Sequence, residues 1–267
     1  RGIRVFPKSQ KAADVAECLK KLCRKCNVEV KYACKVTDIL INSEGGVTGV
    51  DCEGRHFNCK AVITATGGIS YPLTGSTGDG YTWAEKLGHT IVSPRPSLVG
   101  IKSPEKWVGS LEGLSLKNIG FKLYHGNKKV YEDFGEMLFT DKGISGPVVL
   151  SGSRHVLDFN YSNISASIDL KPALNIEKLD NRLRRDFEQL SRKQVSNALG
   201  GLLPKRLIPV VLKKWKVSCD LFVNQVTREQ RRQLTEVLKN FTLKLEGSEG
   251  FERAVVTAGG VKLSEVD

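Results

Sequence analysis

The pattern of hydrophobic and polar positions divides the first hundred residues into one helix and several short strands. Apolar residues recur at helical spacing over about 10–26. Short runs rich in β-branched residues then follow at 28–32, 35–41, 47–52 and 57–66. Glu44-Gly45-Gly46 and Glu53-Gly54 have the composition of hairpin turns. The pattern predicts a helix, a strand and a three-stranded meander, and its last strand ends at Gly67-Gly68.

In the next part of the chain, the sequence pattern changes from one typical of α/β structure to one typical of β structure. A short helix is expected over 77–87 and a strand over 89–92, and the prolines of Ser93-Pro-Arg-Pro-Ser97 indicate a linker. Beyond it, a small antiparallel sheet or barrel is expected from strands at 99–102, 118–124, 129–134, 136–139 and 165–170. Pro147 is expected in the first turn of a helix that opens near Gly143.

The last third is helical and then returns to strand. Helical spacing is found over 176–190, 194–203, 207–215 and 227–240, and Thr227 is the expected cap of the last helix. Strands are expected over 241–245 and 252–257. The fold class is therefore α/β plus α+β, with expected parts at 1–93, 94–172 (barrel-like), 173–240 (helical), 241–252 (return strand) and 253–267 (return to the first domain).

Two similar glycine-containing motifs, called the glycine phrases below, lie far apart in the sequence. Ala65-Thr66-Gly67-Gly68 ends one predicted strand, and Ala258-Gly259-Gly260-Val261 follows another. Glycine has no Cβ, so a strand that stops in glycines lets backbone approach a ligand closely. One ligand site built from both phrases is one interpretation; two ordinary strand-ending turns is the other.

Composition narrows the class of protein. The 267 residues carry a net charge of +12, but the basic residues are spread in ones and twos, which favours solvated faces over a nucleic-acid patch. Six of seven cysteines fall in the first sixty residues, and Cys23-Arg-Lys-Cys26 lies near a helix end without a second pair, so neither a metal site nor a thioredoxin-type centre is expected. The chain has no long apolar run, and a cytoplasmic location without membrane contact is the expectation.

The usual dinucleotide-binding fingerprint is missing from the chain. GxGxxG should follow a strand and open a helix, so that its backbone N–H groups hold the pyrophosphate. Gly75-Ser-Thr-Gly-Asp-Gly80 has GxxGxG spacing and follows a Pro-containing turn instead. Asp79 is interpreted there as a cap of the following helix, with a cover over a ligand as the alternative.

Five phrases in order resemble the BaiN-type, aminoacetone-oxidase-like family of FAD-dependent oxidoreductases. They are the segments at 4–15, 65–72, 74–81, 138–147 and 256–261, and they span almost the whole chain. The chain departs from the family at Ile3, where Gly is common, and at Asp141, where His is common. The resemblance implies a two-dinucleotide-binding-domain flavoprotein whose FAD domain is interrupted by an inserted barrel and helical subdomain. By the same resemblance, this chain is an internal fragment that lacks the N-terminal GxGxxG segment and the C-terminal FAD segment.

The resemblance also implies cofactor contacts, residue by residue. Val36 would meet the adenine, or be a plain strand residue. Thr66, Gly67 and Gly68 would pass close to the phosphates and ribityl chain. Three residues would sit beside the isoalloxazine: Gly259, Gly260 and Val261. Three more would line the flavin pocket: Arg4, Phe6 and Pro7.

The implied activity is flavin-mediated hydride transfer on a small-molecule substrate, as an NAD(P)H-linked reductase or an amine oxidase. In such an enzyme the cofactor carries out the hydride transfer, and the protein binds and orients it. No catalytic acid or base is assigned from the sequence, and no metal is expected. The fragment alone is expected to bind FAD weakly or not at all and to be inactive. A basic nucleic-acid-binding module and a structural interaction module without cofactor stay as alternatives, and the oligomeric state stays open.

Overall fold

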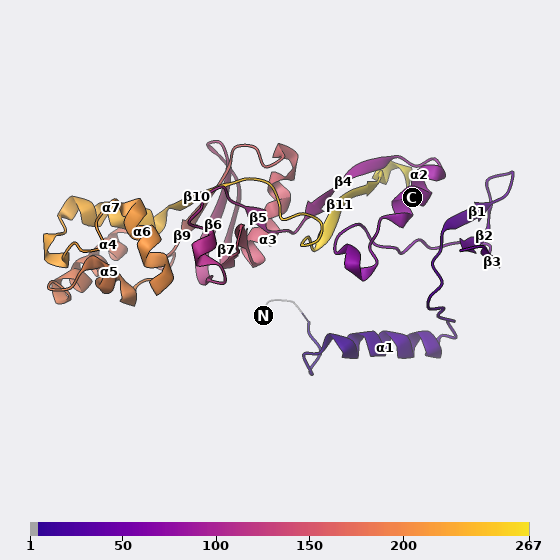
Figure 1. Cartoon of the computed structure of the whole chain (residues 1–267), viewed down its shortest axis with the longest axis horizontal. Helices are drawn as coiled ribbons and strands as arrows, with labels where there is room; N and C mark the ends of the chain where they lie inside the picture. Colours follow the sequence, from indigo (N-terminus) through magenta and orange to yellow (C-terminus); the bar gives the residue numbers. More distant parts are fainter. Residues whose placement is uncertain (1–4, 267) are drawn as a thin grey trace. The chain divides into compact units, whose positions relative to one another are not determined.

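A computed structural model describes residues 5–266 and divides the chain after Thr64 into two compact units. In the first unit, helix α1 (Ala12–Lys25) precedes the strands β1 (Asp38–Ile41), β2 (Val47–Cys52) and β3 (Arg55–Asn58). The strands form an antiparallel meander in the order β1-β2-β3 (Figure 1). The predicted helix and meander are therefore present.

One predicted strand near here is wrong and another is too long. Residues 28–32 carry no strand, and the strand predicted over 57–66 is β3, which ends at Asn58 and leaves 59–66 without a strand. Their apolar side chains face solvent: Tyr32 is 72% exposed and Ile63 is 92% exposed. The apolar stripe of α1 is also uncovered, because none of its residues is buried. β-Branched runs form strands only when a neighbouring strand takes their backbone hydrogen bonds, and the described residues supply no such neighbour.

The second unit begins with helix α2 (Asp79–Lys86) and a two-stranded ribbon. Strand β4 (Ile91–Ser97) pairs antiparallel with β11 (Val256–Val261), so segments about 160 residues apart in sequence lie side by side (Figure 1). The predicted linker at 93–97 is thus wrong, and β4 runs across the expected boundary at residue 93. Proline is tolerated here because each strand of a two-stranded ribbon is an edge strand.

Six strands form the sheet that follows. They are β5 (Ile101–Lys102), β6 (Ser115–His125), β7 (Lys128–Phe139), β8 (Gly143–Ser145), β9 (Ile164–Asp169) and β10 (Phe241–Leu245), in the order β10-β9-β6-β7-β8-β5. The chain after β10 returns to β5, where Ile101 bridges Ser248 and Lys102 exchanges backbone hydrogen bonds with Glu246 and Gly247. The sheet is therefore a nearly closed barrel, as the sequence predicted. The strands expected at 129–134 and 136–139 are one strand, continuous through Gly135.

The helices extend from the barrel in one insertion between β9 and β10 (Figure 1). They are α4 (Ile176–Gln189), α5 (Val195–Ala198), α6 (Ile208–Trp215) and α7 (Arg228–Lys239). Asn175 caps α4 and Thr227 caps α7 through hydrogen bonds to Lys178 N and Gln230 N. Helix α3 (Pro147–Ser153) packs on β7 and has proline at its first position, as expected. One hydrophobic cluster joins the barrel and these helices, with Phe121, Leu183 and Leu234 inside it.

Among residues 5–266, no helix is both long enough and apolar enough to cross a membrane.

Candidate functional site

The two glycine phrases meet in space within the second unit. The Thr257 hydroxyl, on β11, accepts a hydrogen bond from Ile69 N at 3.0 Å. The same hydroxyl lies 2.9 Å from the Ser70 hydroxyl, which is largely buried. The turn at 66–68 is thereby fixed against β11, and we call this place the glycine junction (residues 66–70, Tyr81 and 257–261).

Close approach at the glycine junction requires glycine at two positions. A Cβ on Gly68 would lie 2.5 Å from the Thr257 Oγ1 and 3.1 Å from the Tyr81 hydroxyl oxygen. A Cβ on Gly260, where φ is +109°, would lie 3.1 Å from the Tyr81 ring. Tyr81 of α2 therefore packs between the two phrases. The sequence interpretation expected a ligand as the close neighbour; here the neighbours are residues of the chain itself.

Gly259 and Gly260 lie inside β11 and not after it, which corrects the predicted strand at 252–257. The pairing with β4 shifts register between Ala258 and Gly260, where Ser93 and Pro94 of β4 oppose Gly259 alone, so β4 carries a bulge opposite Gly259. A Cβ on Gly259 would lie only 2.6 Å from Ser93 O, and its φ is +90°. The bulge of β4 thus lies directly against the backbone of Gly259.

The turn itself leaves polar backbone unpaired. Within residues 5–266, the peptide groups of Thr66, Gly67 and Gly68 make no hydrogen bond. Gly67 is exposed and has φ of +72°. A turn with free N–H groups and no side chain above them suits phosphate or hydroxyl oxygens. These residues fit one wall of a site for a phosphate-bearing cofactor such as FAD.

The other predicted cofactor residues are not brought together with these by the structure. Phe6, Pro7 and Val36 belong to the first unit, where Phe6 is 57% exposed and Val36 is half-buried just before β1. Arg4 lies outside the described residues. The interpretation of Asp79 as a helix cap is wrong, because Gly78 is the N-cap and Asp79 is the first residue of α2.

All seven cysteines are free, and no cluster of His, Cys, Asp and Glu in residues 5–266 has the geometry of a metal site. A hydrogen bond with Cys34 and burial raise the pKa of Cys52 to about 11, so this thiol is protonated at neutral pH. Cys23 lies near the end of α1 and Cys26 is its C-cap, as the sequence predicted.

Several cavities of the second unit lie away from the glycine junction, and the sequence interpretation missed them. The first, of about 280 Å³, is lined by Tyr131, Arg154 and His155. The rings of Tyr131 and His155 stack with their centroids 4.9 Å apart. Burial first, and the Arg154 charge second, lower the pKa of His155. The His155 ring is thus neutral at pH 7, which leaves it able to accept a proton only in acid.

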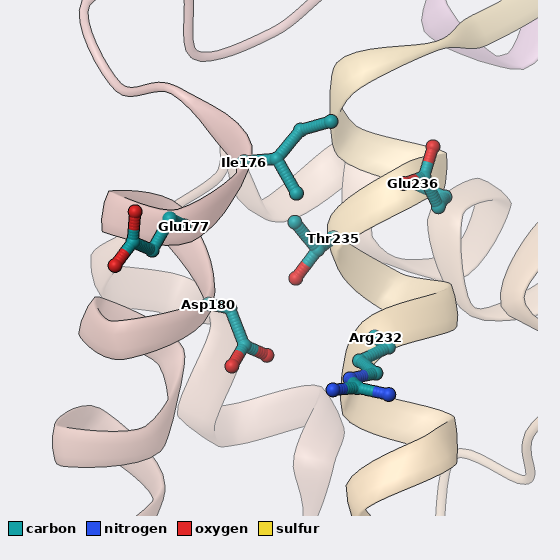
Figure 2. A pocket seen from close by; sticks show the side chains of 6 residues that line it. All are labelled: Ile176, Glu177, Asp180, Arg232, Thr235 and Glu236. Carbon is teal, nitrogen blue, oxygen red and sulfur yellow. The ribbon is translucent and has the colours of Figure 1, made fainter.

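The second cavity, of about 440 Å³, lies between α4 and α7 (Figure 2). Ile176 and Thr235 point toward one another across it, and Asp180 points from α4 toward α7. Arg231 donates two hydrogen bonds to the Asp180 carboxylate, at 2.8 and 3.1 Å. These bonds, aided by the charges of Arg232 and Arg228 and opposed by burial, lower the pKa of Asp180. The ion pair joins the two helices, which is a structural role.

The third cavity, of about 610 Å³, lies where the barrel meets the inserted helices. Its residues come from β6, β7, the loop after β9 and α4, so no single stretch of sequence could have indicated it.

The architecture defines a class: a β-barrel with a helical insertion between its last two strands, connected to the β4–β11 ribbon that carries the glycine junction. The family model described as "HI0933-like protein barrel and H2TH domain" matches residues 95–256, which cover this barrel and its insertion. The chain belongs to the HI0933-like family.

Three relatives extend the match to nearly the whole chain. The chain is 29% identical over its full length to a 3-dehydro-bile acid delta(4,6)-reductase of Clostridium scindens, and covers 65% of that protein. It is 31% identical over 94% of its length to a ribosomal RNA dihydrouridine synthase of Haemophilus influenzae, covering 60%. The Escherichia coli protein of the same name is 28% identical over 96% of the chain, with 61% covered. The chain thus spans 60–65% of the length of these relatives.

Proposed function

We propose that this chain is part of an FAD-dependent oxidoreductase, and that the glycine junction is one wall of its flavin site. The observation that carries the proposal is the meeting of two glycine phrases, 190 residues apart, around a turn with unpaired peptide groups. The names of the relatives support it, because a reductase and a dihydrouridine synthase each add hydrogen to their substrate. Bound FAD supplies this chemistry as hydride transfer.

The residues of the junction have separate roles in this proposal. The N–H groups of Thr66, Gly67 and Gly68 donate hydrogen bonds to phosphate or ribityl oxygens. Thr257 holds the turn in place through Ile69 and Ser70. Gly259 leaves room for the backbone of β4 and Gly260 leaves room for the Tyr81 ring, so both shape the wall, and with Val261 they are proposed to lie beside the flavin ring system. Phe6, Pro7 and Val36 are proposed to contribute from the first unit, and NAD(P)H is the proposed source of electrons.

Exposed apolar surface in the first unit supports a larger FAD domain. Val15, Leu19 and Leu22 on one face of α1 are each about half exposed, as are Val28 and Val30. Contiguous apolar surface of this kind marks a place where another part of a protein packs. We propose that further chain covers it in the whole protein, and that this chain alone binds FAD weakly.

The relatives differ in what their names say they act on, a bile acid in one and ribosomal RNA in the others. The proposal therefore concerns the shared hydride chemistry. The inserted barrel and helices then determine the substrate, since they lie outside the junction that is proposed to hold the flavin.

Flavin content of the full reading frame tests the proposal. The purified protein should be yellow, with about one FAD per chain released on denaturation. Gly68→Ala should lose FAD, because its Cβ would displace the Thr257 hydroxyl that holds the turn. Gly200→Ala is the matched control, since a Cβ there would meet nothing within 4 Å. A colourless protein that FAD cannot reconstitute would refute the proposal.

A further inference from the structure

The cavity between the barrel and the inserted helices is lined by an unusual set of side chains. Lys117 and Asn118 lie at a bulge of β6, where pairing with β7 skips from Leu116 to Ile119. Phe134 of β7 is 60% exposed and forms part of the wall. Lys171, in the loop after β9, and Arg182 of α4 complete the polar lining. A bulge redirects side chains, which explains how a barrel strand presents Lys117 and Asn118 here.

The electrostatics of this cavity are one-sided. Three cations line it, and no carboxylate among the described residues does. Burial first, and the nearby Arg182 charge second, lower the pKa of Lys171. Arg182 has one acidic partner, Asp186, at 3.6 Å on the next turn of α4. Like charges held together against desolvation are stabilised by an anion, so the cavity is suited to a phosphate.

The loop that carries Lys171 is fixed by contacts with Lys239. Lys239 of α7 pairs with the Asp169 carboxylate at 2.5 Å and donates to Leu174 O at 2.7 Å and Lys171 O at 3.3 Å. This arrangement pairs Asp169, the last residue of β9, with a different lysine. Lys171 is thereby left to the cavity, in a position that needs no reordering when a ligand binds.

We propose that this cavity binds one nucleotide of a single-stranded nucleic acid, with the base stacked on Phe134 and the phosphate held by Lys117, Lys171 and Arg182. An exposed aromatic ring beside clustered cations is the arrangement by which proteins hold unpaired bases and their backbone. Asn118 carries both a donor and an acceptor, so it can pair with a base edge. The volume of about 610 Å³ accommodates such a ligand.

The helical insertion, which contributes Arg182 to this site, is basic in composition. Residues 173–240 contain 15 Lys or Arg and 7 Asp or Glu, a net of +8 out of the chain's +12. The strand can therefore continue from the cavity over the helical insertion, where phosphate contacts give affinity without sequence preference. The proposal does not depend on flavin, because every group it uses lies outside the glycine junction.

Binding of a fluorescein-labelled dodecauridylate to the 267-residue chain, followed by anisotropy at several salt concentrations, tests the proposal. Phe134→Ala should weaken binding about 5- to 150-fold, from a stacking energy of about 1–3 kcal/mol. Lys171→Gln should weaken binding and reduce the salt slope by about 0.7, the value for one phosphate contact on a single strand. A duplex of the same length should bind less tightly, because its bases are already stacked.

Two matched variants separate the site from general effects of charge and aromatic loss. Phe222→Ala removes another exposed ring and Lys128→Gln another exposed cation, neither of which lines the cavity. Both should bind the oligonucleotide within about twofold of the unmodified chain. Circular dichroism confirms that each variant is folded. Absence of binding, equal binding of the duplex, or equal loss in Phe134→Ala and Phe222→Ala would each overturn the proposal.

Discussion

The bulge of β4 opposite Gly259 makes the sharpest prediction about how the glycine junction is built. In Gly259→Ala, the new Cβ would lie 2.6 Å from Ser93 O and 2.8 Å from Val92 O, and both are backbone atoms that cannot swing away. The backbone at φ of +90° adds strain of about 1–3 kcal/mol for any residue with a Cβ. Overpacking against the facing strand adds about 1–3 kcal/mol more. Together these should lower the stability of the β4–β11 ribbon by about 2–6 kcal/mol.

Gly75→Ala separates the two contributions. Gly75 has φ of +96°, close to that of Gly259, but a Cβ there would meet nothing within 4 Å. It should therefore show the strain alone, about 1–3 kcal/mol. Urea unfolding gives the global effect, and hydrogen exchange of peptides over 91–97 and 256–261 gives the local one. If Gly259→Ala is no more destabilising than Gly75→Ala, the close approach of β4 and β11 at the bulge is wrong.

Three further predictions concern single contacts. Thr257→Val should lower the free energy of unfolding by about 1–2 kcal/mol in urea titrations, because Ile69 N loses its acceptor, whereas Thr257→Ser should keep most of it. Lys239→Met should cost about 1–3 kcal/mol in the same assay by leaving Asp169 without its partner, and no loss would contradict the role given to Lys239. The lowered pKa of Asp180 gives stability that is present above its unfolded value of 3.8 and is lost as pH falls through the folded value. Asp180→Asn should thus be less stable than the unmodified chain at pH 7, and the difference should shrink in thermal melts below about pH 4.

Local signals predicted the helical insertion well. Helix α7 begins after Thr227 and α4 after Asn175, because each start depends on a cap and an apolar stripe within a few residues. The barrel strands were also predictable from alternation. Gly135 was misinterpreted as a break, although it keeps β7 continuous and allows close packing, since a Cβ there would lie 2.8 Å from a Val148 methyl.

The wrong predictions concern segments whose structure depends on pairing with strands far away in the sequence. Pro94 and Pro96 indicated a linker, but β11 pairs with that segment from the far end of the chain. The runs at 28–32 and 59–66 have strand composition, yet no described strand lies beside them. Periodicity reports which side chains need burial, and it does not report which segment provides it.

The candidate site was likewise predictable from the sequence only in part. The sequence indicated both glycine phrases and their common location, but not that Thr257 and Tyr81 fill the space between them. It also favoured solvated faces for the basic residues, because Lys117, Lys171 and Arg182 are scattered along the chain. Their convergence on one cavity is a property of the barrel–helix packing, and it reopens the nucleic-acid interpretation.

Hydrogen exchange of the full-length protein with and without FAD tests the central claim most directly. FAD should slow exchange in two separate peptides, one over 65–70 and one over 256–262, because both belong to the wall that is proposed to hold the cofactor. The peptide over 199–203, which lies in the helical insertion, should be unchanged. Protection of only one glycine phrase, or of neither when FAD is bound, would contradict a flavin site at the glycine junction.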